Sequence, residues 1–235
     1  MGSEIKDIMK EGKDLWWNGM HAEAAHVFRR ALERSEILYG RNAPEVISPL
    51  YWLSSSLALS SGEGPSEQRA DAAALLRRAL GTAETHFGSS DRRLINILSA
   101  LALDLDMLEM HSEAYDHIAR ALKISEIAYG ERGDTLSILG ILTELLLKLD
   151  RPAEALPFAE RALRLQEPRT SELSWIGIGY ACRALGRCLM GIGRNEEAIA
   201  YLERCLALFK ARHPGKKISL EDELLGWIED LRKRS

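Results

Sequence analysis

The side chains that could carry chemistry are few, and their spacing does not suit metal binding. His21 and His26 are five residues apart, and His111 and His117 are six apart. Two metal ligands on one helical face are expected at a spacing of four residues. We therefore predict that these histidines hold no metal ion.

Acidic residues gather in one short segment around a predicted turn. The polar residues of this segment are Asp104, Asp106, Glu109, His111 and Glu113. We interpret them as a solvated turn.

Elsewhere, Gly191 and Gly193 lack the preceding strand and the further glycines of a phosphate-binding loop. No Ser, His and acid set has the context of a known catalytic motif, so we predict no enzyme activity, no metal and no cofactor.

Three cysteines are an odd number for a disulfide framework, and none belongs to a Cys-x-x-Cys pair. Cys182 and Cys188 are six residues apart, which places them on nearly opposite faces of a helix. Cys205 occupies a position that is alanine elsewhere in the pattern described below. We predict that Cys182 and Cys205 are small buried thiols.

Composition and charge exclude several classes of protein. The chain has 235 residues, 46% hydrophobic and only 6% aromatic, with a formal net charge of −4. A negative net charge gives no long-range attraction to nucleic acid, so we expect no nucleic-acid partner. No stretch reaches the roughly 20 apolar residues of a membrane span, and the N-terminus lacks the apolar run of a signal peptide. We expect a soluble, cytoplasmic protein without membrane insertion.

The chain contains an internal sequence repeat, which predicts the helices that carry these residues. The segment RALERSEILYG, residues 30–40, returns as RALGTAETHFG at residues 78–88 and as RALKISEIAYG at residues 120–130. The matched alanines of five copies are Ala24, Ala72, Ala114, Ala155 and Ala198. They are separated by steps of 48, 42, 41 and 43 residues. A nearly constant step of this length is typical of solenoid proteins.

Within each copy, apolar and small residues recur at spacings of three and four, which places them on one helical face. The third copy shows the pattern as Leu98, Leu101, Ala102 and Leu105 before a turn, then Ala114, Ile118 and Ala121 after it. Small residues in this pattern allow two helix backbones to approach closely. Each copy therefore predicts a helical hairpin.

Five such copies in register resemble the tetratricopeptide repeat family, in the long variant of about 42 residues found in kinesin light chains and many bacterial relatives. The resemblance extends over roughly residues 5–212. It implies an all-α, right-handed solenoid of five helical hairpins. We expect one array over residues 1–235, with repeats at about 3–40, 44–88, 91–130, 134–169 and 171–212 and a capping helix at 219–234.

Two local features depart from the regular pattern. The segment SSGEGPSEQ, residues 60–68, contains the extra residues of the second copy, and we interpret it as a lengthened, solvated hairpin turn. The first helix of the last copy contains Gly177, Gly179 and Gly186. Glycine destabilises a helix, so we expect these residues to allow close approach of a neighbour or a ligand.

The resemblance also implies that the first helix of each hairpin lines a concave groove that binds a peptide or a helix of a partner protein. The residues on the groove face are Lys6, Met9, Lys13, Trp16, Tyr51, Ser55, Asn96, Ser99, Leu103, Asp106, Gly140, Glu144, Tyr180, Arg183 and Arg187. The chaperone-binding subclass holds a terminal carboxylate with Lys, Asn and Arg. We exclude that function, because Tyr51, Ser99 and Gly140 occupy places where it needs polar side chains.

Two alternatives stay open for Arg183 and Arg187, which lie one turn apart. They could meet acidic groups of a partner, or they could pair with Glu144 and with carboxylates of neighbouring helices. For the whole chain, the first expectation is a non-enzymatic scaffold or adaptor. The alternatives are a self-assembling, homo-oligomeric module and a peptide-sensing regulatory domain of a larger bacterial protein.

Overall fold

The fold is all-helical, as the repeat pattern predicts. The computed structural model describes residues 2–62, 64–130, 135–167, 174–213 and 217–234. In these ranges the regular elements are α-helices and one short 3-10 helix, with no β-strand. The predicted repeat limits at 134, 169 and 171 lie outside the described residues. The chain divides into two compact units, Met1–Ala128 and Tyr129–Ser235.

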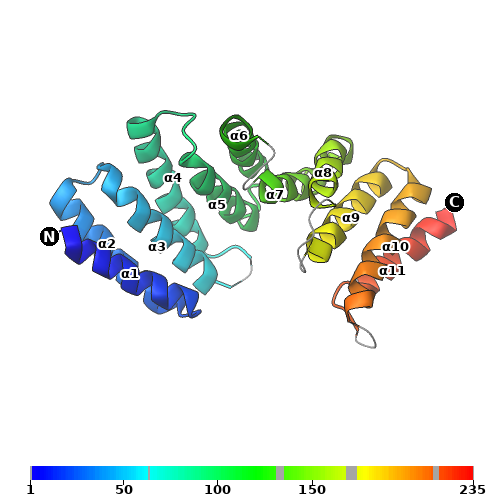
Figure 1. Cartoon of the computed structure of the whole chain (residues 1–235), viewed down its shortest axis with the longest axis horizontal. Coiled ribbons are helices and arrows are strands. Elements are labelled where there is room, and N and C mark those ends of the chain that lie inside the picture. Colours follow the sequence, from blue (N-terminus) through cyan, green and yellow to red (C-terminus); the bar gives the residue numbers. More distant parts are fainter. Residues whose placement is uncertain (1, 63, 131–134, 168–173, 214–216, 235) are drawn as a thin grey trace. The chain divides into compact units, whose positions relative to one another are not determined.

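In the first unit, the helices from α1 to α5 form a series in which each packs on the next (Figure 1). The elements of this unit are α1 (Gly2–Trp17), α2 (His21–Tyr39), η1 (Pro44–Val46), α3 (Ile47–Ser60), α4 (Glu67–Phe87), α5 (Leu94–Met107) and α6 (His111–Tyr129), whose last residue already belongs to the second unit. The first helices of the hairpins also meet, since α3 contacts both α1 and α5.

The second unit repeats this arrangement. Its elements are α7 (Thr135–Lys148), α8 (Pro152–Gln166), α9 (Ser174–Gly191), α10 (Asn195–Arg212) and α11 (Glu221–Arg234). Consecutive helices pack on one another, and α7 also contacts α9. In α11, Leu224, Ile228 and Leu231 are buried, whereas Glu229, Asp230 and the last three residues are exposed. This helix therefore buries one face and presents a charged one.

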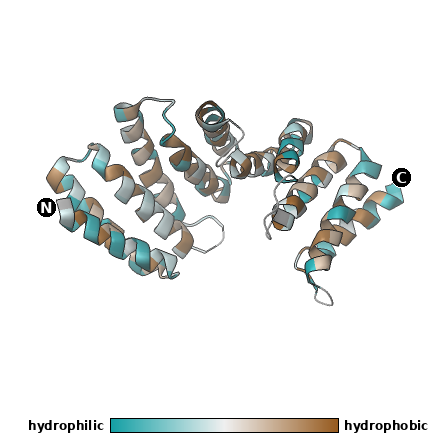
Figure 2. Ribbon diagram, viewed as in Figure 1, coloured by the Kyte–Doolittle hydropathy of each residue, from teal (hydrophilic) through white to brown (hydrophobic). Residues whose placement is uncertain are grey.

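The repeat alanines mark the core of both units. Ala24, Ala72, Ala114, Ala155 and Ala198 are all 0% exposed, because each lies where a second helix meets its partner. Several first helices are apolar on more than one face, since a helix enclosed by neighbours must bury more of its circumference. In Figure 2, α5 is accordingly mostly brown, whereas α1 is largely teal.

Glycines in the last repeat allow helices to approach closely. Their nearest neighbours are side chains of this same protein. A Cβ on Gly186 would lie 2.6 Å from Leu202 Cδ2, and one on Gly179 would lie 2.4 Å from Phe209 Cε2. A Cβ on Gly177 would lie 2.0 Å from the amide nitrogen of Gln166. The predicted close approach is therefore present.

Four hairpin turns share one backbone geometry. The residue with positive φ is Gly19 (78°), Glu109 (62°), Asp150 (56°) or Gly193 (78°). In each turn the following N–H donates to a carbonyl five residues earlier, over 2.9 to 3.0 Å: Met20 to Leu15, Met110 to Leu105, Arg151 to Leu146 and Arg194 to Leu189. This is the bond that closes a helix ending in a left-handed residue.

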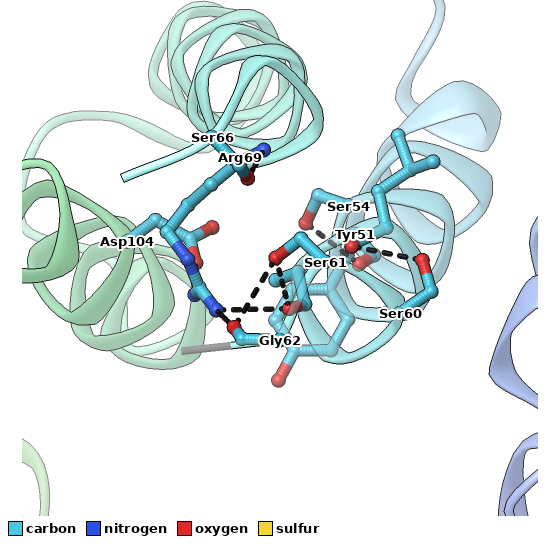
Figure 3. A network of polar contacts seen from close by, with 10 residues as sticks. Tyr51, Ser54, Ser60, Ser61, Gly62, Ser66, Arg69 and Asp104 are labelled. Atoms are coloured by element: carbon cyan, nitrogen blue, oxygen red, sulfur yellow. Dashed lines mark hydrogen bonds and ion pairs between the residues drawn. The ribbon is translucent and has the colours of Figure 1, made fainter. Parts of the chain in front are cut away.

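The lengthened turn of the second repeat is held by Arg69. Its Nη2 donates to the carbonyls of Ala58, at 2.9 Å, and Gly62, at 2.8 Å. Ser66 caps α4, since its Oγ accepts from the Arg69 backbone N–H at 3.1 Å. Figure 3 shows the guanidinium between the end of α3 and Asp104 on α5. The predicted turn is present, but its ends are anchored rather than only solvated.

Asp104 corrects the interpretation of the acidic segment as a solvated turn. Its carboxylate is buried and lies 3.1 Å from Arg69 Nη1. Burial raises the pKa of Asp104 to about 6, although the charge and hydrogen bond of Arg69 act in the opposite direction. Asp106, by contrast, is half-buried and lies 3.0 Å from His111 Nδ1. The segment thus contains one interhelical ion pair inside the stack.

Candidate functional site

Two adjoining clefts run along the first helices of the first unit. The first has a volume of about 470 Å³ and is lined by Ile5, Lys6, Met9, Lys10, Lys13, Tyr39, Glu45, Ser48 and Pro49. The second has a volume of about 390 Å³ and is lined by Pro44, Ile47, Ser48, Tyr51, Trp52, Ala83, Phe87, Arg93, Asn96 and Ile97. Ser48 belongs to both. Five residues of the predicted groove therefore line these clefts: Lys6, Met9, Lys13, Tyr51 and Asn96.

The other groove residues predicted for this unit lie outside these two clefts. They are Trp16, Ser55, Ser99, Leu103 and Asp106. Trp16 is half-buried, with its ring centroid 5.4 Å from that of Trp52 and 4.7 Å from that of Trp17. Trp16 therefore belongs to the packing of the N-terminal repeat, while Trp17 is 71% exposed.

A third cleft lies within the second unit, between α7, α8 and α9. Its volume is about 370 Å³, and its lining residues are Leu136, Ser137, Gly140, Thr143, Glu144, Ala159, Ala162, Gln166, Gly177, Tyr180, Ala181 and Ala184. It brings together three residues of the predicted groove, Gly140, Glu144 and Tyr180. Tyr180 is 53% exposed, so its ring is available at the opening of the cleft.

The two arginines of α9 are engaged by carboxylates of the chain itself. Arg187 forms an ion pair with Glu144, and Arg183 Nη2 lies 3.0 Å from Glu223 Oε1 on α11. Both guanidinium groups also face Trp227, at 5.4 and 5.9 Å from the ring centroid. The second of the two alternatives, pairing with Glu144 and a neighbouring helix, is the one observed. We therefore leave Arg183 and Arg187 out of the proposed binding site.

The three thiols are buried and poorly suited to act as nucleophiles. Burial raises the pKa of Cys182 and Cys205 to about 11 and that of Cys188 to about 12. A thiol must lose its proton to react or to bind a metal, so these side chains behave as apolar groups. Among the residues that the structure describes, no group of three His, Cys, Asp or Glu side chains is arranged to hold a metal ion.

Sequence reasoning missed the aromatic residues that the second helices contribute to the clefts. Tyr39 and Phe87 each precede the glycine that ends a second helix, and each lines one of the clefts of the first unit. The Arg93 guanidinium lies 3.4 Å from the centre of the Phe87 ring. The repeated YG and FG endings were a visible signal, since an aromatic at the same place in successive repeats lies on the same side of the stack.

Comparison with known proteins supports the repeat assignment. Residues 93–167 match one sequence profile of the tetratricopeptide repeat family, and residues 181–212 match a second. No curated protein sequence matches the chain. In the described residues no helix is both long and apolar enough to cross a membrane.

Similar folds occur among solved structures. Tetratricopeptide-like repeats of a Podosopora anserina kinesin light chain superpose with a TM-score of 0.74 at 15% identity, covering 92% of this chain and 99% of that one. BtubC (BKLC) from P. vanneervenii gives 0.76 at 18% identity, covering 92% of this chain and 84% of that one. MamA gives 0.64 at 15% identity, covering 93% and 100%.

These TM-scores show a shared fold. The repeat profiles match residues 93–167 and 181–212, and the five matched alanines are buried, so the chain contains tetratricopeptide repeats within a fold of that kind.

Proposed function

We propose that the chain is a non-enzymatic, cytoplasmic scaffold that binds a peptide or a helix of a partner protein along the first helices of its repeats. The observation that carries the proposal is the pair of adjoining clefts on α1, α3 and α5. The two clefts adjoin at Ser48, which lines both, and we refer to the pair as the channel. A channel of this kind suits an extended or helical segment better than a compact small molecule.

The chemistry of the channel supports protein recognition. Tyr39 is 42% exposed, and Tyr51 and Met9 are half-buried, so apolar and aromatic surface remains accessible. Aromatic side chains are over-represented among the residues that dominate binding energy. Asn96 and Ser48 are exposed and supply hydrogen-bonding groups between these anchors. The channel can therefore make apolar contacts with a bound peptide and orient it by hydrogen bonds.

Site-specific photo-crosslinking in the native cells tests the proposal. A photoreactive phenylalanine analogue is placed at Tyr51, inside the channel, and in a second variant at Ile37, which is 80% exposed on α2 and lines neither cleft. We expect a covalent adduct with another protein from the Tyr51 variant and none from the Ile37 variant. Adducts from Ile37 alone would place binding on another face and overturn the proposed groove.

A further inference from the structure

The charges of α1 are sorted onto two faces. Lys6, Lys10 and Lys13 follow one another at spacings of four and three residues, so they share one side of the helix. The acidic residues form a second row with spacings of three, four and three: Glu4, Asp7, Glu11 and Asp14. A helix with mixed charge thus presents one basic and one acidic side.

The acidic side faces the neighbouring helix of the same repeat. Glu11 Oε2 lies 3.0 Å from Arg30 Nη2, and Glu4 Oε1 lies 3.5 Å from Arg34 Nε. Both arginines belong to α2. The rotation of α1 is set by its buried side, where Ile8 packs with Val27 and Ala31, and the lysine row lies on the side of the cleft.

The lysine row has no acidic partner in the described part of the chain. No carboxylate there lies within 4.0 Å of the ammonium groups of Lys6, Lys10 or Lys13, and all three side chains line the first cleft. Lys6 and Lys10 are exposed. Lys13 is half-buried, and its Nζ lies 5.2 Å from the centre of the Trp52 ring. The cleft therefore has one wall of uncompensated positive charge.

The floor between the lysines and α3 is apolar. Ile5 and Met9 are half-buried, Pro49 is buried, and Tyr39 closes one side. Glu45 is exposed on the side formed by η1, opposite α1. An occupant that matches this surface needs acidic groups toward α1, an apolar group toward the floor, and a hydrogen-bond donor or cation toward Glu45.

We propose that this first cleft recognises an internal acidic segment of a partner protein, with Asp or Glu side chains facing Lys6 and Lys10 and an apolar side chain between Met9 and Pro49. The inference rests on the proposed function and adds the chemical class of the partner. The apolar floor favours a peptide over a polyanion such as nucleic acid, whose phosphates would leave that floor without a contact. Unlike recognition of a terminal carboxylate, this binding uses side-chain charges only.

The experiment begins with a display library of random peptides, each flanked on both sides by constant sequence so that no terminus is free. Peptides that bind the full-length chain are selected from this library. The selected sequences are then synthesised with acetylated and amidated ends, and their affinities are measured by fluorescence anisotropy. The test variant is Lys6→Glu with Lys10→Glu. The matched control is Arg29→Glu with Lys123→Glu, which changes the net charge equally at exposed positions outside both clefts of the first unit.

We expect the selected peptides to be enriched in Asp and Glu relative to the library. The test variant should weaken their binding about tenfold or more, and the control should change it less than about twofold. Circular dichroism of both variants establishes that the helices are retained.

Peptides without acidic enrichment, or equal affinities for the test and control variants, would overturn the acidic preference. They would leave the groove proposal standing if the Tyr51 crosslink forms. A library that yields no binder overturns the inference as well, and absence of the Tyr51 adduct in addition would overturn both.

Discussion

Arg69 and Asp104 form a buried ion pair between α4 and α5 whose energetics depend on pH. The pKa of Asp104 is raised by burial from 3.8 to about 6, so the folded state binds its proton more tightly than the unfolded state does. The contribution of this group to stability is therefore greatest below pH 3.8, falls as the pH rises toward 6, and is constant above that value.

We expect this linkage to lower the free energy of unfolding of the wild type by about 1 kcal/mol between pH 5 and pH 7. Replacing Asp104 with Asn removes the titrating group while keeping the shape of the side chain. Urea unfolding at both pH values measures the difference, and the change between pH 5 and 7 should be smaller in the variant by that amount. Identical pH dependence in the two proteins would contradict the raised pKa.

Gly186 on α9 has no Cβ, and this absence allows α9 to pack closely against Leu202 on α10. Gly186→Ala would gain about 1 kcal/mol in helix propensity, but the new Cβ would lie 2.6 Å from the buried Leu202. Overpacking of this kind costs about 1 to 3 kcal/mol, so we expect a net loss of stability.

The matched control is Gly81→Ala on α4, where a Cβ meets nothing within 4 Å and the residue is exposed. That change should raise stability by about 0.5 to 1 kcal/mol. Thermal unfolding of the two variants gives opposite shifts if close contact is the reason for Gly186. Stabilisation by both alanines would show that α9 and α10 can separate without penalty.

At the scale of elements, the repeated turn lets one position be compared among repeats. Glu109 has a φ of 62°, whereas the equivalent residue of the last repeat is Gly193. In this left-handed region of the backbone, a residue with a Cβ is about 1 to 2 kcal/mol less stable than glycine. Glycine loses more entropy on folding, which offsets part of that difference.

We therefore expect Glu109→Gly to stabilise the chain by about 0.5 to 1 kcal/mol and Gly193→Ala to destabilise it by a similar amount. Chemical denaturation of both variants measures the two effects. Destabilisation by Glu109→Gly would mean that the Glu109 side chain makes a contact worth more than its backbone strain.

Much of the architecture of the helices could be predicted from the sequence, because a spacing of three and four residues and a repeat of about 42 residues specify which faces are buried. The helical hairpins and the buried alanines follow from these spacings. The Arg69 to Asp104 pair could not be predicted, since the two residues are 35 positions apart and each resembles a solvated surface group. Its formation depends on how α4 and α5 are stacked.

The candidate site could also be predicted only in part. Of the ten groove residues that periodicity predicted in the first unit, five line the clefts, including Lys6, Met9 and Tyr51, and five do not. Periodicity could not show that Tyr39 and Phe87 reach the same clefts from the second helices. Nor could it choose between the two alternatives for Arg183, because Glu223 is 40 residues away on α11.

At the scale of the whole molecule, all three cysteines lie in the second unit, on α9 and α10. Since burial raises the pKa of each thiol to about 11 or 12, we expect none to react with a thiol reagent at pH 8 while this unit is folded. Labelling followed by mass spectrometry should show all three modified together, at a rate that rises with denaturant. Rapid modification of one cysteine in the native protein would indicate local opening of α9 or α10.

The anchoring of the lengthened turn bears on how such a chain can change during evolution. Arg69, in the first turn of α4, binds the carbonyls of Ala58 and Gly62 and the carboxylate of Asp104, so the end of α3 is tied directly to α4 and α5. We therefore expect that residues inserted after Gly64 leave the register of the neighbouring repeats unchanged. The same anchoring predicts that relatives differ in length at this turn, and that a reporter domain inserted there leaves the stack intact.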